Sequence, residues 1–176
     1  MIVRSTILAA GICAFASTSG SGQGQAGAWH RGALPSGTAS IETPCAPGEE
    51  QTLTRGGSEG IRCLEGLYEA GIIYTDGPSF ANGAFGDQPF EGVRLALLSD
   101  PWAVEHEELT VLGRRAVRWV GQSSFGYGAM ATVEMPNDTM ILFRVRPRGE
   151  DQDAERLSGL LDRAIASLDL SEEGQD

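Results

Sequence analysis

The chain has 176 residues, and its 24 acidic residues outnumber its 13 basic ones, which gives a formal net charge of −11. This length suits one domain with a sizeable core, and the negative charge disfavours nucleic acid and anionic membrane surfaces as partners, because both select basic faces. All the basic residues are arginine, which excludes Schiff-base lysines, lysine general bases and phosphate-loop lysines.

The first 16 residues have the features of an export signal. Arg4 supplies a basic start, residues 7–15 form an apolar run, and Ala14–Phe15–Ala16 offers a cleavage site with small residues at both ends. The apolar run is too short to anchor the chain permanently in a bilayer. We therefore expect residues 1–16 to be a signal peptide, the mature protein to be periplasmic or secreted, and no membrane anchor to remain after cleavage.

The rest of the chain divides into a leader, a domain and a tail. Residues 17–40 are rich in Gly, Ser, Ala and Gln without a hydrophobic period, which is typical of a flexible leader. The patterned residues predict a single domain over 41–170, and residues 171–176 form a polar tail.

Cys45 and Cys63 are an even pair in an oxidising compartment, once Cys13 has left with the signal. Their spacing differs from the Cys-x-x-Cys of redox pairs, and the stretch between them holds no histidine for a zinc site. We expect a disulfide, which would stabilise the fold by about 3 kcal/mol in the loop-entropy model.

Residues 61–64 and 67–75 have the composition of strands and lead into a glycine-rich segment, 76–92, with three evenly spaced phenylalanines. Long glycine-rich loops often bind partners. The predicted partner contacts are the aromatic and acidic residues of this segment and of the turn near residue 125: Asp76, Phe80, Phe85, Asp87, Phe90, Phe125 and Tyr127. The alternative is that the phenylalanines pack onto the domain's own core.

Residues 93–98 are expected to form a strand, followed by a short helix over 101–108. Asp100–Pro101 is typical of an N-cap and a first helical residue. His106 and its neighbouring glutamates would then lie on an acidic helix. A metal-assisted hydrolase is conceivable there, but no second histidine lies at ligand spacing. We therefore expect no metal, no cofactor and a solvated acidic helix.

The last third of the chain has the clearest pattern. Residues 116–120 alternate as a strand, with Val117 and Trp119 on one face, and residues 129–135 and 139–146 alternate on either side of the turn at Pro136. Pairing these two strands in antiparallel register places Val133 opposite Ile141, Ala131 opposite Phe143 and Ala129 opposite Val145. A slip by one residue would destroy this match.

Residues 151–168 are expected to form an amphipathic helix on the sheet. Acidic residues precede a set of apolar residues at helical spacing: Ala154, Leu157, Leu160, Leu161, Ala164, Ile165 and Leu168. The fold class is therefore α+β, with a mostly antiparallel sheet of about five strands flanked by helices.

A serine nucleophile is not indicated. The stretch from Gly121 to Gly126 has its second glycine one place too late for a Gly-x-Ser-x-Gly elbow, and it lies between two predicted antiparallel strands. We expect no catalytic residues.

Two stretches resemble a known family. Thr110–Val–Leu–Gly113–Arg–Arg–Ala116–Val117 opens the strand region, and the last helix ends in Ile165–Ala–Ser–Leu–Asp–Leu170. This layout over residues 110–170 is similar to the C-terminal half of PsbP/Mog1-like α/β/α sandwich domains, although Arg115 stands where those families often have proline. The resemblance implies a mostly antiparallel sheet between helices and an accessory or binding role, with no catalytic residues to carry over.

Together these observations predict an exported, non-catalytic accessory or binding protein of the bacterial periplasm. It would contact a protein partner through loop aromatics and acidic residues. The alternatives are a metal-assisted hydrolase and a structural protein of the cell envelope.

Overall fold

The computed structural model describes residues 29–45, 48–55, 58–65, 68–75, 89–123, 126–137, 139–147 and 153–171. The predicted signal peptide, residues 17–28 of the predicted leader and residues 172–176 of the tail lie outside this described part.

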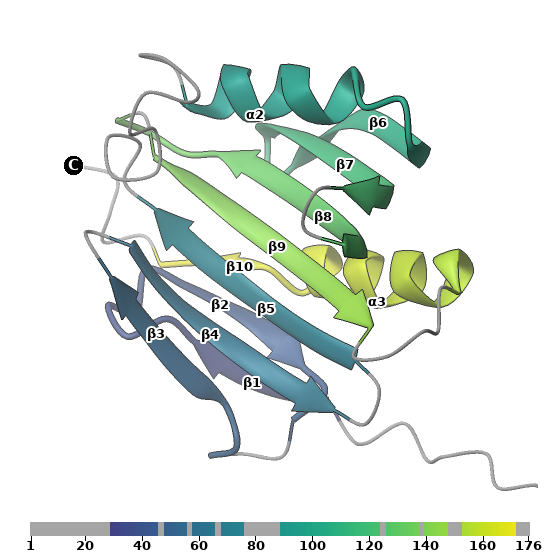
Figure 1. Ribbon diagram of the computed structural model, residues 1–176. Coiled ribbons are helices and arrows are strands. Elements are labelled where there is room, and N and C mark those ends of the chain that lie inside the picture. Colours follow the sequence, from purple (N-terminus) through teal and green to yellow (C-terminus); the bar gives the residue numbers. More distant parts are fainter. Residues whose placement is uncertain are drawn as a thin grey trace, which may run out of the picture.

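A large antiparallel sheet of seven strands, in the order β3-β4-β5-β9-β8-β7-β6, forms the centre of the protein (Figure 1). Its strands are β3 (Gln51–Arg55), β4 (Ser58–Glu65), β5 (Tyr68–Thr75), β6 (Ala103–Val111), β7 (Arg114–Ser123), β8 (Gly126–Glu134) and β9 (Met140–Pro147). A small sheet in the order β1-β2-β10 contains β1 (His30–Ala33), β2 (Ala39–Thr43) and β10 (Asp169–Leu170). The predicted α+β class is confirmed, and the large sheet has more strands than expected.

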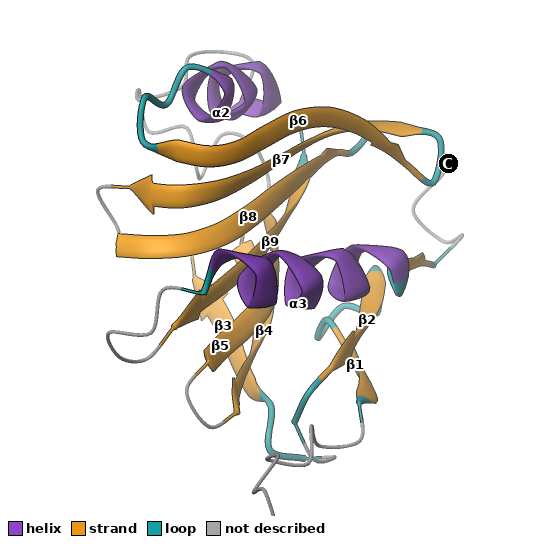
Figure 2. Ribbon diagram, turned by 90° about the vertical axis from the view of Figure 1, so that its right-hand side faces the viewer, coloured by secondary structure: helices purple, strands orange, loops and turns teal. Residues whose placement is uncertain are grey.

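Two helices lie on opposite faces of the large sheet (Figure 2). Helix α2 (Pro89–Leu98) packs on β6, β7 and β8, and helix α3 (Ala154–Ala166) packs mainly on β8 and β9. Within the described residues, no helix is long and apolar enough to cross a membrane. We call the two sides of the sheet the α2 face and the α3 face.

The predicted hairpin register is confirmed. In β8 and β9, Ala129 pairs with Val145, Ala131 with Phe143 and Val133 with Ile141. All six side chains are buried in one cluster on the α3 face. A small residue on β8 thus faces a larger one on β9, which lets the side chains interdigitate.

Helix α3 covers this cluster, as its apolar spacing predicts. Leu157, Leu161 and Ala164 are its buried residues. The helix begins after Asp153, whose side chain accepts a hydrogen bond from the backbone N–H of Arg156 at 3.1 Å. This N-cap satisfies one of the free donors of the first turn.

Two predictions between residues 93 and 108 are wrong. The expected strand over 93–98 is part of α2, because a short apolar run looks alike in a buried strand and a buried helix. Val93 and Leu97, four residues apart, pack with Val117 and Trp119 in a second apolar cluster. The expected helix over 101–108 is instead part of β6, which extends and pairs with β7.

The folded part begins earlier than predicted, so the leader expected over 17–40 is wrong for its last residues. Strand β1 pairs with β2 from His30–Thr43 to Ala33–Ser40. Leu34, Ala39 and Ile41 are buried in the main cluster with α3. The segment is therefore structured by its pairing with β2 and by the burial of these side chains, although its composition shows no strand-like period.

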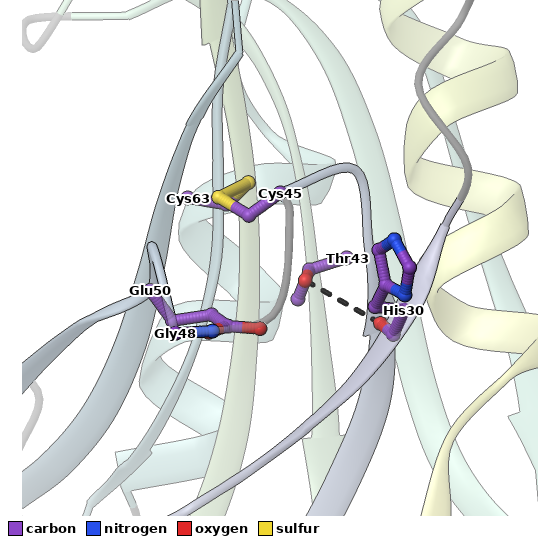
Figure 3. Close-up of a disulfide and its surroundings, with 6 residues drawn as sticks. All are labelled: His30, Thr43, Cys45, Gly48, Glu50 and Cys63. Atoms are coloured by element: carbon purple, nitrogen blue, oxygen red, sulfur yellow. Dashed lines mark hydrogen bonds between the residues drawn. A yellow bond between two sulfur atoms is a disulfide. The ribbon is translucent and has the colours of Figure 1, made fainter.

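Cys45 and Cys63 are joined in the predicted disulfide, with their Cα atoms 5.6 Å apart (Figure 3). Cys45 follows β2 of the small sheet, and Cys63 belongs to β4 of the large sheet. Nearby, the Thr43 hydroxyl donates to the His30 carbonyl at 3.4 Å. The disulfide therefore links the two sheets covalently.

Candidate functional site

Only two of the residues predicted to contact a partner lie in the described part of the chain, Phe90 and Tyr127. The other predicted contacts lie outside it: Asp76, Phe80, Phe85, Asp87 and Phe125.

Phe90 and Tyr127 lie on opposite faces of the large sheet, so they do not form one surface. Phe90 is near the start of α2 and is only 6% exposed. The Arg115 guanidinium carbon lies 5.3 Å from the centre of its ring. Tyr127 is half-buried against the α3-face cluster. For Phe90 the structure therefore favours the alternative, in which the phenylalanine packs on the protein itself.

Charged side chains fasten α2 to the strands beneath it. The Glu91 carboxylate accepts hydrogen bonds from Arg94 Nε at 2.7 Å and from Arg115 Nη2 at 2.5 Å. Arg94 also donates to Glu108 on β6. The hydrogen bonds from Arg94 and then Arg115 lower the pKa of Glu91. These charges already have partners, so this network serves to hold the helix.

The outer edge of β6 is the feature best placed to contact a partner. Strand β6 is nine residues long and ends the large sheet, and the described residues offer no strand on its outer side. An edge of this kind presents unpaired backbone N–H and C=O groups that can pair with another extended chain. A bulge between Ala103 and Glu105 shortens the regular part of the edge.

Two large apolar side chains stand exposed where β6 begins. Trp102 is 66% exposed and Val104 is 61% exposed. Beside them, an open depression of about 470 Å³ is lined by Ala103, Val104, Glu105, His106, Glu107 and Arg118. Exposed tryptophan is a frequent anchor of protein interfaces.

The backbone that carries Trp102 is held in place although its side chain is free. The Asp100 carboxylate accepts from the Trp102 N–H at 2.9 Å, and the Gln122 N–H donates to the Trp102 carbonyl at 3.3 Å. Gly121 permits this approach, because a Cβ there would lie 2.5 Å from the Trp102 carbonyl oxygen. A side chain on a fixed backbone has less freedom to lose on binding.

Acidic side chains on β6 surround a buried arginine on the α3 face. The Arg118 side chain is 7% exposed, and it donates to Glu105 at 2.9 Å and to Asp162 on α3 at 2.8 Å. Glu107 lies 3.9 Å away. Although burial opposes it, hydrogen bonding to Glu105 and Asp162 raises the pKa of Arg118. Three carboxylates around one guanidinium leave two negative charges beside the edge.

Tyr127 lies in the same acidic surroundings. Burial raises the pKa of its hydroxyl, and the negative charges of Glu105 and Asp153 raise it further. Of the predicted partner contacts, Tyr127 lies on β8, two strands in from β6, and Phe90 lines a depression together with Glu108, Leu109 and Thr110 of β6.

His106 does not share a face with Glu105 and Glu107, the neighbouring glutamates of the conceivable metal site. On β6 it lies opposite Trp119 and points to the α2 face, whereas Glu105 and Glu107 lie opposite Val120 and Arg118 and point to the α3 face. Within the described residues, no three His, Cys, Asp or Glu side chains are grouped to hold a metal ion.

The sequence reasoning missed Trp102, Val104 and Arg118 as site residues. A signal was present: residues 103–111 contain β-branched Val104, Thr110 and Val111 and lack the apolar stripe of a helix that packs on a sheet. The Asp100–Pro101 pair, which is typical of a helix start, nevertheless favoured a helix over this strand signal.

The chain matches no family model and no curated protein. Among solved structures, it is similar to cyanobacterial PsbP from Synechocystis, with 16% identity, a TM-score of 0.47, and coverage of 85% of this chain and 96% of that one. A protein of unknown function from Pseudomonas aeruginosa matches with 13% identity, a TM-score of 0.32, and coverage of 75% and 94% respectively. The first of these similarities agrees with the predicted resemblance to PsbP-like domains.

Proposed function

We propose that this chain is an exported, non-catalytic binding protein that pairs the outer edge of β6 with an extended, basic segment of a protein partner. The observation that carries the proposal is a long strand edge that no described strand pairs with and that begins at an exposed tryptophan on a fixed backbone. Soluble proteins usually protect such edges from pairing with other chains. Exposed apolar side chains such as Trp102 instead mark a surface that binds a partner.

The chemistry of the edge selects the kind of partner. Strand addition takes its affinity from main-chain hydrogen bonds and its specificity from side-chain contacts. Trp102 and Val104 offer an apolar contact, and Glu105 and Glu107 are exposed carboxylates on the same strand, whose negative charge Arg118 balances only in part. An extended segment that alternates apolar and basic side chains complements both, and the net charge of −11 would attract it.

Export belongs to the same proposal. It is supported by the signal-like residues 1–16 and by the disulfide, which persists in a non-reducing compartment.

A photo-crosslinking amino acid at position 104, introduced into the full chain in its own cells, tests the binding surface. We expect it to capture one protein and to map to an extended segment with arginine or lysine. The same group at Leu53, which is also exposed but lies on β3 at the other edge of the large sheet, is the matched control. Capture of the same segment from both positions, or capture of an acidic or helical segment from position 104, would refute the proposal.

A further inference from the structure

The α2 face carries a second feature, which is independent of the β6 edge. Helix α2 covers β6, β7 and β8, and no described helix has substantial contacts with this face over β4, β5 and β9 (Figure 1). Three arginines lie there in a protein of strongly negative charge: Arg62 on β4, and Arg144 and Arg146 on β9.

The strand register brings these arginines together. Arg62 and Arg144 both lie opposite Gly71 of the intervening strand β5, so all three positions point to the same face. Gly71 has no side chain to fill the space between the two arginines. Arg146 lies two residues after Arg144 and opposite Glu69.

One carboxylate serves the whole cluster. Glu69, whose side chain is only 14% exposed, accepts from Arg146 Nη2 at 2.7 Å, and Arg62 Nη1 lies 3.9 Å from the same oxygen. Three guanidinium groups and one carboxylate leave two positive charges. The remaining contact of Arg62 is a hydrogen bond to the neutral side chain of Gln51.

Two groups in the cluster, the Arg62 Nε–H and the Arg144 guanidinium, have no partner among the described residues. Arg62 Nε is buried and makes no hydrogen bond. Half-buried Arg144 has no ion pair among the described residues. Burial lowers the pKa of Arg144, and the positive charge of Arg146 lowers it further, against the opposing effect of Glu69. Burying a charged donor without a partner is unfavourable, so a bound anion that accepts hydrogen bonds from these groups would be stabilised.

We propose that Arg62, Arg144 and Arg146 form a binding site for a small dianionic oxyanion of the phosphate class. Arginine forks bind the oxygens of such anions with paired, charge-assisted hydrogen bonds. A dianion would balance the two positive charges and supply acceptors to the free donors, whereas a single carboxylate would balance only one charge.

Inorganic phosphate is the probe. The full, disulfide-bonded chain is titrated at pH 8 and constant ionic strength, and the ¹⁵N signals of the arginine Nε–H groups are followed by NMR. We expect saturable shifts of Arg62 and Arg144, and binding of phosphate at least about tenfold tighter than that of acetate, because acetate leaves one charge unbalanced.

Two variants of the cluster should change the affinity in opposite directions. Arg144→Gln should weaken phosphate binding about tenfold or more, since it removes one charged donor. Glu69→Gln should tighten it, since it removes the competing carboxylate. Arg115→Gln is the matched control, because this exposed arginine is paired with Glu91 and lies outside the cluster. This variant should bind phosphate with the affinity of the wild type.

The direction of these changes in phosphate affinity distinguishes an anion-binding site from a cluster that only stabilises the fold. No saturable shift of the Arg62 and Arg144 signals, equal affinity for acetate and phosphate, or equal affinity in Arg144→Gln and Arg115→Gln would each overturn the proposal. Since Arg144 has no ion pair within the described part of the chain and is repelled by Arg146, its replacement should leave the domain folded, which the amide spectrum of the variant checks.

Discussion

The two faces of the large sheet differ in what covers them. The α3 face is closed by helix α3 and by the small sheet, and its apolar cluster includes residues from Leu34 to Leu168. On the α2 face, the described residues form a smaller apolar cluster around Trp119 under α2, and arginines lie over β4 and β9. The α3 face therefore holds the fold together, while the α2 face and the β6 edge have groups left over for binding.

The largest expected effect compares two neighbours on β9. Phe143 is fully buried on the α3 face, so Phe143→Ala should lower the free energy of unfolding by about 3–5 kcal/mol. Leu142 points to the α2 face and is only partly buried, so Leu142→Ala should cost about 1 kcal/mol. Urea denaturation measures both. Equal losses of unfolding free energy would show that the two faces contribute equally to stability, which would contradict the contrast drawn between them.

A smaller effect is expected at the ion pairs on the two faces. Arg118→Gln removes a nearly buried guanidinium from Glu105 and Asp162, and we expect a loss of about 2 kcal/mol, below the range for a fully buried pair because both carboxylates are half exposed. Arg115→Gln breaks only exposed pairs and should cost about 0–1 kcal/mol. Thermal unfolding of the two variants in parallel tests this ranking. A greater loss of stability in Arg115→Gln than in Arg118→Gln would contradict it.

The smallest effect is a pH dependence at the base of α2. Because Arg94 and Arg115 lower the pKa of Glu91 in the folded state, the unfolded chain binds its proton first as the pH falls. The contribution of Glu91 to stability should therefore be complete above the ordinary glutamate pKa of about 4.3 and be lost progressively below it.

The Glu91→Gln variant isolates this contribution. The difference in unfolding free energy between the wild type and the variant, measured from pH 6 down to pH 3, should shrink as the pH falls. A constant or growing difference would mean that the network does not favour the charged carboxylate.

The sequence predicted well where burial on one face imposes a period. The alternation of Ala129, Ala131 and Val133 against Ile141, Phe143 and Val145 determined the hairpin register, and the spacing of Leu157, Leu161 and Ala164 located α3. These patterns all belong to the α3 face.

The α2 face and the β6 edge were harder to predict. Asp100 accepts from the N–H of Trp102, which is the local chemistry of an N-cap, but pairing with β7 then draws the chain into a strand. The arginine cluster unites residues from β4 and β9 that are far apart in the sequence, through Gly71, and no local pattern reveals such a neighbourhood.

Amide hydrogen exchange of β6 tests the central claim, that its outer edge is the binding surface, most directly. A synthetic peptide of the segment captured from position 104 is added to the full chain, and exchange is followed residue by residue. The account predicts that outward-facing amides between Val104 and Val111 become protected, that the amides of edge strand β3 do not, and that Trp102→Ala reduces the protection. Protection of β3, or none at β6 under saturating peptide, would contradict it.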